Sequence, residues 1–250
     1  MKTTEAPAGS PRPLSLSDLN VNQLAARVSD LGAESYRVTQ ILDGAWRSVA
    51  TSWSGVTTLG KPLQERLANE IRFIAFDGIE RQEAEDGATT KLLLTLSDGA
   101  QVEAVLMRSP ADPRRGSGPR ATVCVSSQAG CAVGCPFCAT GELGFTRNLS
   151  AGEIQDQVRI ARQILRAEGR ELTNVVYMGM GEPLQNADAV FASIVVLLIQ
   201  RVAGLDNVAS PSRPAASSQG SNVLPSSAPR SPLRSLFMRR VIRSATSSCP

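Results

Sequence analysis

The feature that most constrains the fold is a loop with three cysteines, Cys131, Cys135 and Cys138, between a strand-like and a helix-like segment. The preceding segment 121–126 is apolar and β-branched, which favours a buried strand. After the loop, Ser150 with a glutamate three positions later forms a capping box that marks the start of a helix. A strand followed by a loop and a helix is the opening of an α/β unit.

The α/β pattern continues for one further repeat and then stops. The helix predicted after Ser150 carries an apolar face and ends at Gly169, and a second strand follows at Asn174–Met178. Strand, helix and strand in this order form a right-handed parallel unit. A further helix is predicted over 187–202. One parallel unit and one helix are too little to close a barrel, so either the domain is truncated or strands escape detection. We assign 121–205 to this core.

Two other regions precede the core. Residues 14–72 are predicted to form a small bundle of three helices, with Gly32 as a helix stop and Pro62 in a permitted first turn. Residues 73–120 are predicted to be a β-rich connector, since Asp-Gly pairs at 86–87 and 98–99 are hairpin signals. We expect strands at 91–96 and 101–107, the latter alternating apolar and polar residues.

The two ends have a different composition. Residues 1–13 lack the apolar centre of a secretory signal, and 206–250 are rich in Ser, Pro and Arg with no acidic residue after Asp206. Both ends are predicted to be disordered. No uninterrupted apolar run reaches the roughly 18 residues that a membrane span needs, so we expect a cytoplasmic protein.

The chain has no histidine, which excludes His-based triads and His–zinc sites. Clustered thiols in a cytosolic protein are more typical of metal binding or redox chemistry than of disulfides. Three thiolates on one loop can hold three corners of a four-iron cube and leave one iron open for a small chelating molecule. The alternative is a zinc knuckle, with Cys124 or Cys249 as the fourth ligand; zinc sites more often show paired two-residue spacings.

The spacing and its surroundings resemble a known family. The three-then-two spacing of the cysteines is similar to that of the radical S-adenosylmethionine superfamily. The wider motifs resemble the adenine-C2 RNA methyltransferases of the RlmN/Cfr type, dual-specificity enzymes for 23S rRNA and tRNA. These motifs are Cys124–Cys131, Phe137–Gly141, Gly144-Phe145, Arg147–Leu149, Val176–Leu184, Tyr36-Arg37 with Gln40-Ile41, and Gln101-Val102-Glu103. The resemblance extends from about Leu14 to Asn186.

The resemblance implies a fold and two cofactors. The fold would be α/β, an incomplete radical-SAM β/α barrel (a partial TIM-like barrel) preceded by the helical bundle and the β-hairpin region. Cys131, Cys135 and Cys138 would bind a [4Fe–4S] cluster, whose open iron would chelate S-adenosyl-L-methionine. Gly181 and Glu182 would contact the methionine end of that molecule through a charge-assisted hydrogen bond. On residue pattern alone, the same Gly-Glu-Pro is also typical of an ordinary turn at a strand end.

Two further residues take catalytic roles by resemblance. Cys124 would resolve a covalent protein–RNA adduct by disulfide formation, and Glu103 would accept a proton. From the residues alone, the preferred interpretation of Cys124 is a small buried apolar residue of a strand. A solvent-facing strand position explains Glu103 as well as a catalytic role does. The family's later strands and its methyl-carrying cysteine have no recognisable counterpart after about residue 200, and we do not assign that role to Cys249.

The implied reaction is methylation of C2 of an adenine in the peptidyl transferase centre of 23S rRNA, and in tRNA anticodon loops. The implied partners are these RNAs and an electron donor such as flavodoxin or ferredoxin, with the protein itself a monomer. Two alternatives come from other classes: an inactive truncated fragment that keeps the Fe–S site and binds RNA, and a zinc-binding structural module.

Overall fold

The computed structural model describes residues 14–111, 114 and 118–200. The predictions for 1–13 and 206–250, and Cys249 with them, lie outside the described residues. The elements are η1 (Leu16–Asp18), α1 (Val21–Asp30), α2 (Tyr36–Trp46), η2 (Trp53–Gly55), α3 (Lys61–Glu70), β1 (Phe76–Glu83), β2 (Thr89–Leu96), β3 (Gln101–Ser109), β4 (Arg120–Cys124), β5 (Gln128–Gly130), α4 (Ala139–Glu142), β6 (Phe145–Asn148), α5 (Ala151–Ala167), β7 (Asn174–Val176), η4 (Pro183–Asn186) and α6 (Ala187–Gln200).

The three helices predicted for the N-terminal region are present as α1, α2 and α3. Gly32 follows α1 with a φ of +64°, as expected of a helix stop. The bundle has its own apolar core, in which Trp53 packs edge-on against Phe73 and donates from Nε1 to the Ile71 carbonyl oxygen at 2.7 Å. This region therefore folds around a core distinct from that of the sheet.

The β-rich region and the core share one sheet, in the order β1-β2-β3-β4-β7. The first four strands pair antiparallel in sequence order, and β4 pairs with β7 in parallel. This last pair confirms the parallel unit expected from the sequence. The hairpin turns are also confirmed, because Gly87 and Gly99 have φ values of +65° and +80° in the two connections.

Strand β1 is not evident in the sequence pattern. All but the first of its residues are at least partly exposed, and it forms one edge of the sheet, so it lacks the alternation that identifies a half-buried strand. The two short strands β5 and β6 escape prediction for a similar reason, since three- and four-residue strands are too short to show a period.

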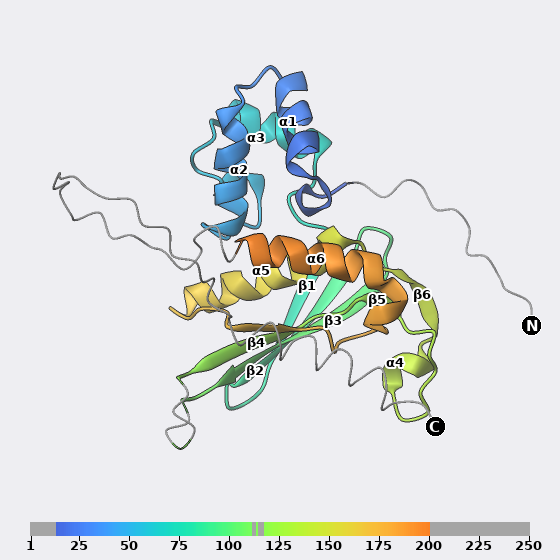
Figure 1. Ribbon diagram of the computed structural model, residues 1–250. Helices are drawn as coiled ribbons and strands as arrows, with labels where there is room; N and C mark the ends of the chain where they lie inside the picture. The colour runs from blue at the N-terminus through green and yellow to red at the C-terminus, as the bar shows by residue number, and fades with distance from the viewer. Residues whose placement is uncertain (1–13, 112–113, 115–117, 201–250) are drawn as a thin grey trace, which may run out of the picture. The chain divides into compact units, whose positions relative to one another are not determined.

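Helix α5 is buried on both sides (Figure 1). Its predicted apolar face packs on the sheet. On its other side, the side chains of Asp156 and Arg159 have no exposed surface and bond to the N-terminal region. Periodicity predicts the first face, whereas the second is polar and resembles a solvated face in the sequence. The helix is thus the layer that joins the bundle to the sheet.

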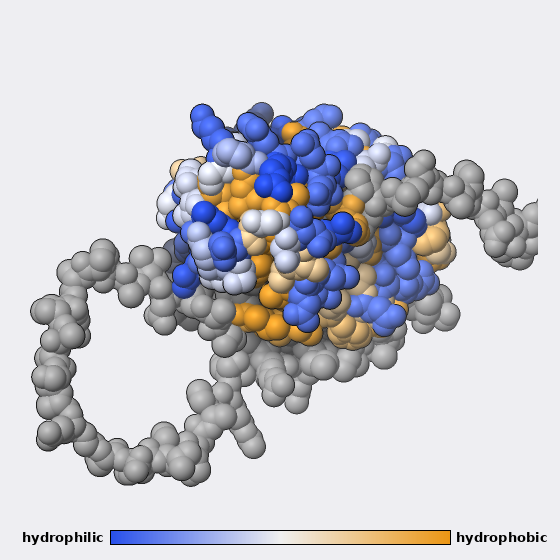
Figure 2. Space-filling view, turned by 90° about the horizontal axis from the view of Figure 1, so that it is seen from above, coloured by the Kyte–Doolittle hydropathy of each residue, from blue (hydrophilic) through white to orange (hydrophobic). Residues whose placement is uncertain are grey.

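The five-stranded sheet is open, with β1 and β7 at its edges. No closed barrel is formed by the part of the chain that the structure describes. Helix α6, which packs beside α5, leaves Phe191, Val195 and Leu198 about half exposed. Figure 2 shows apolar side chains gathered between polar ones on the face seen from above.

A search of the described helices for a membrane span finds none with the required length and apolar character.

Candidate functional site

The cysteine loop leaves the sheet through a two-stranded ribbon of β5 and β6. The ribbon brings the two ends of the loop together, and the Cys131 amide donates to the Gly144 carbonyl oxygen at 2.9 Å. Gly130 has a φ of +74°, and a Cβ placed there would lie 1.9 Å from that same oxygen. Only glycine therefore allows the loop to close at this point.

Cys131, Cys135 and Cys138 are partly exposed residues, and their thiols form no disulfide. Cys138 stands at the N-terminus of the short helix α4. The backbone amides of Gly141 and Thr140 hold the pKa of the Cys138 thiol below its ordinary value, because they donate hydrogen bonds that favour the thiolate. The loop thus carries three thiols, and the neighbouring backbone amides favour the thiolate form of one of them.

The donor set fits an iron–sulfur cluster in its chemistry. In the described residues no three His, Cys, Asp or Glu side chains converge on a single metal position. A cubane cluster binds each thiolate to a different iron, so its three ligands surround the cluster rather than meet at one point. Three free cysteines on one loop closed by a ribbon match that requirement in number and kind.

The turn after β7 folds back onto the segment that follows β4. Gly179 donates to the Val125 carbonyl oxygen at 3.0 Å, and the Met180 carbonyl oxygen accepts from the Ser127 amide at 2.9 Å. The Ser126 hydroxyl accepts from the Met180 amide at 2.8 Å. A Cβ at Gly179 would lie 2.7 Å from the Ser126 hydroxyl. The two strand ends are therefore fastened directly to each other.

Gly181 and Glu182 are half-buried at the outer side of this turn. Gly181 has a φ of +94°, a conformation that favours glycine. The Glu182 carboxylate accepts from the Leu184 amide at 3.1 Å and so begins the short helix η4. One carboxylate oxygen is held by its own turn in this way, which fixes the direction of the side chain.

The predicted catalytic pair lies on the face of the sheet away from α5. Cys124 is the register partner of Val105, and Glu103 is two residues from Val105 on β3, so all three share one face. Burial raises the pKa of the Cys124 thiol above its ordinary value. The Glu103 carboxylate pairs with Lys91 Nζ at 2.6 Å. The structure thus brings these two residues to the same surface, at the end where β4 runs into the cysteine loop.

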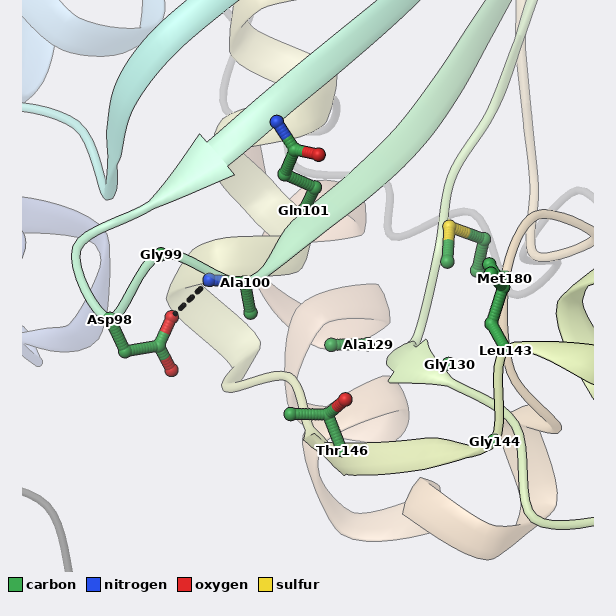
Figure 3. A pocket seen from close by; sticks show the side chains of 10 residues that line it. All are labelled: Asp98, Gly99, Ala100, Gln101, Ala129, Gly130, Leu143, Gly144, Thr146 and Met180. Atoms are coloured by element: carbon green, nitrogen blue, oxygen red, sulfur yellow. Dashed lines mark hydrogen bonds between the residues drawn. The ribbon is translucent and has the colours of Figure 1, made fainter.

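A hollow of about 340 Å³ lies beside this loop (Figure 3). Its wall includes the β2–β3 turn at Asp98 and Gly99, the ribbon residues Gly130 and Gly144, and Met180 from the turn after β7. Both loops that the sequence singled out therefore border one cavity. Arg147 holds the wall together, because it pairs with Asp98 at 2.5 Å and with Glu153 at 2.9 Å.

Several residues of this site were missed by sequence reasoning. Ser126, Gln128 and Asn186 are buried and bond the loops to one another. The available signal was the run of polar residues 126–128 directly after an apolar strand, because polar groups at the carboxyl end of a strand commonly line a site in α/β folds. From the sequence, Arg147 is recognised only as part of the Arg147–Leu149 motif, and its ion-pair partners are not predicted.

Comparison with known proteins identifies relatives. No protein-family model matches the chain. The chain is 40% identical over 185 residues to a dual-specificity RNA methyltransferase RlmN of Syntrophobacter fumaroxidans, covering 74% of this chain and 51% of that protein. It is 44% identical over 181 residues to the RlmN of Halorhodospira halophila, covering 72% of this chain and 47% of the relative. A ribosomal RNA large subunit methyltransferase N of Nitrosopumilus maritimus is 42% identical over 180 residues, covering 71% of this chain and 51% of the relative.

The fold has a solved counterpart. A crystal structure of a radical SAM methyltransferase from Sphaerobacter thermophilus matches with a TM-score of 0.67 and 42% identity, covering 74% of this chain and 52% of that chain. The resemblance predicted from the motifs is thereby confirmed. The chain spans about half the length of the curated relatives it matches.

Proposed function

We infer that this chain carries the cofactor-binding part of a radical S-adenosylmethionine RNA methyltransferase of the RlmN type, to which its matched residues are 40% identical or more. The observation that carries the inference is the meeting of two loops. The ribbon that closes the cysteine loop and the turn containing Gly181 and Glu182 are both fastened to the end of β4.

Cys131, Cys135 and Cys138 would hold a [4Fe–4S] cluster through three of its irons. When bound, such a cluster supplies the electron that cleaves S-adenosylmethionine to a 5′-deoxyadenosyl radical. The chain contributes three free thiols on one closed loop. The lowered pKa of Cys138 favours the thiolate form that binds iron.

Glu182 and Gly181 would bind the methionine end of S-adenosylmethionine. One oxygen of the Glu182 carboxylate accepts from the Leu184 amide, and a carboxylate can accept further hydrogen bonds, including those of an ammonium group. Gly181 has no side chain to obstruct a ligand that approaches the turn. The hollow beside Gly130, Gly144 and Met180 supports a ligand at this end of the sheet.

Cys124 and Glu103 would act on the RNA. We propose that the target is C2 of an adenine in 23S rRNA, with tRNA as a second substrate. Their common face of the sheet supports this assignment, since a substrate lying there can reach both residues. Glu103 would accept a proton only after its pairing with Lys91 is exchanged for contact with the substrate.

The test is anaerobic reconstitution with iron and sulfide, followed by iron analysis. Methyl transfer to 23S rRNA and tRNA is then measured in the presence of S-adenosylmethionine and reduced flavodoxin. We expect about four irons per chain and 2-methyladenine in the RNA. Cys135→Ala should lose the iron, whereas Cys124→Ala should keep the iron and lose methyl transfer. About one zinc per chain with no bound iron would refute the proposal in favour of a zinc module.

A second candidate is a protein that binds the cluster and RNA but does not turn over, because the family's methyl-carrying cysteine has no recognisable counterpart after about residue 200. The same reconstituted protein separates the two when RNA binding is measured as well. Full iron loading and bound RNA without any methylated adenine would identify the inactive fragment. If RNA binding also keeps the same salt dependence after residues 206–250 are deleted, this Ser/Pro/Arg-rich tail is not its electrostatic contact.

A further inference from the structure

Gln128 is a buried amide side chain beneath the turn that contains Gly181 and Glu182. Its side chain is 1% exposed. Its Oε1 accepts from the Glu182 backbone amide at 2.9 Å, and its Nε2 donates to Asn148 Oδ1 at 2.8 Å. One planar group therefore joins the turn after β7 to strand β6, across the end of β5.

The contact with Gly181 is equally close. A Cβ at Gly181 would lie 2.5 Å from Gln128 Cβ and 2.7 Å from Gln128 Cγ. The aliphatic part of the glutamine therefore supports the peptide of Gly181, while its amide holds the next peptide by a hydrogen bond. The turn cannot move toward the sheet, and movement away from it breaks the bond to Glu182.

A second amide fastens the same region. Asn186 is 8% exposed, and its Nδ2 donates to the carbonyl oxygens of Ser127 at 2.8 Å and Leu149 at 2.7 Å. These two bonds fix the end of η4 to the residue before β5 and to the residue after β6. Neither of these bonds involves Glu182, whose backbone amide is held by Gln128.

We propose that Gln128 is a positioning residue that sets the Gly181–Glu182 turn for binding of S-adenosylmethionine. The proposal rests on the function proposed above. A glutamine is suited to the task because it accepts at one end and donates at the other, and both neighbours are satisfied at once. Leucine has neither group, so the Glu182 amide would lose its partner. Glutamate keeps the acceptor, and because burial favours its protonated form, its hydroxyl can donate to Asn148 in place of the amide.

The experiment compares the chain with Gln128→Leu, Gln128→Glu and the control Gln82→Leu, whose side chain is exposed on edge strand β1. Two quantities are measured on anaerobically reconstituted protein. Hydrogen exchange of a peptide containing Glu182 reports on the turn, and titration with S-adenosylmethionine reports on affinity. Iron content shows that each variant has folded and loaded.

We expect Gln128→Leu to keep its iron, to exchange faster at Glu182, and to bind S-adenosylmethionine about tenfold more weakly, the order of magnitude for one lost hydrogen bond to a partly buried group. Gln128→Glu should recover most of the affinity, and Gln82→Leu should match the unaltered chain. Unchanged exchange in Gln128→Leu, or faster exchange with unchanged affinity, overturns the proposal. If the unaltered chain takes up iron but binds no S-adenosylmethionine, the proposed function fails, and the positioning role fails with it.

Discussion

Arg159 offers the sharpest test of how the N-terminal bundle is joined to the sheet. Its guanidinium is fully buried and makes four hydrogen bonds, to Asp156 Oδ1 at 2.7 Å, to the Ser17 hydroxyl at 3.0 Å, and to the carbonyl oxygens of Phe73 and Ala50 at 3.1 Å each. It also lies over the Phe73 ring, 4.9 Å from the centroid. Arg159→Met keeps the aliphatic stem and removes all of these interactions.

The cost follows from what is left behind. Asp156 is fully buried and would keep only the Ser17 hydroxyl and the Ala75 amide as donors. Breaking a buried ion pair by removing one partner costs about 3–5 kcal/mol, because an uncompensated charge remains. We expect Arg159→Met to lower the free energy of unfolding by that amount. Replacing both residues, with Asp156→Leu added, should recover part of the loss, since no buried charge then remains.

The two tryptophans allow the effect to be localised. Trp46 and Trp53 both lie in the core of the bundle, so their fluorescence reports on that region, whereas far-ultraviolet circular dichroism reports on the whole chain. In urea we expect the two transitions of Arg159→Met to separate, with the fluorescence change at lower urea. The matched control is Arg27→Met, whose side chain is exposed on α1.

A loss below about 1 kcal/mol in Arg159→Met would contradict this reasoning, because that is the size of an exposed ion pair and not of a buried one. If the fluorescence and circular-dichroism transitions instead coincide and both indicate a loss of about 3–5 kcal/mol, the predicted energy is confirmed. The idea that Arg159 couples the core of the bundle to the core of the sheet is then refuted.

Three further predictions concern the site and its surroundings. Gly130→Ala should prevent closure of the cysteine loop, because the added Cβ would overlap the Gly144 carbonyl oxygen. Iron uptake after reconstitution measures the effect, and normal iron uptake would contradict the prediction. Near pH 8, Cys124 should be alkylated by iodoacetamide more slowly than a free cysteine, because burial raises its pKa and lowers the fraction present as thiolate. Peptide mass spectrometry measures the rate of alkylation. The difference between the two cysteines should vanish in denaturant. The Arg108 guanidinium donates to the Glu168 carboxylate and lowers its pKa. The pair therefore stabilises the folded protein at pH values above the ordinary carboxyl pKa of 4.5. This stabilisation is lost as the pH falls through the lower pKa that Glu168 has in the folded protein. Arg108→Gln should therefore reduce the urea midpoint at neutral pH and have a smaller effect in strong acid; an equal effect at both would be inconsistent with an ionised pair.

Much of the fold follows from local patterns in the sequence. The apolar face of α5, its capping serine, and the glycine turns of the hairpins are set by residues close together in the chain, and the structure confirms all of them. The parallel pairing of β4 with β7 was also predictable, since a strand, a helix and a strand have essentially one favourable handedness. Strand β1 escaped because an edge strand with exposed residues has no apolar alternation.

The candidate site also has one part that the sequence predicts and another that it does not. The spacing of Cys131, Cys135 and Cys138 by itself indicates a cluster, because ligands on one short loop are close together in the sequence as well as in space. Gln128 does not stand out, since its importance depends on Glu182 and Asn148, which are 54 and 20 residues away along the chain. A glutamine in a polar run is typical of a solvated segment.

By itself, the sequence determined which residues could hold iron, where the longer helices and the half-buried strands would lie, and which family the motifs resemble. Only the tertiary structure decided which side chains support them. Arg159 and Gln128 are polar residues that sequence patterns assign to the surface, yet both are buried. The physical reason is that a buried polar group is stable only when its partners surround it, and those partners come from distant parts of the chain. Such an environment exists only after folding.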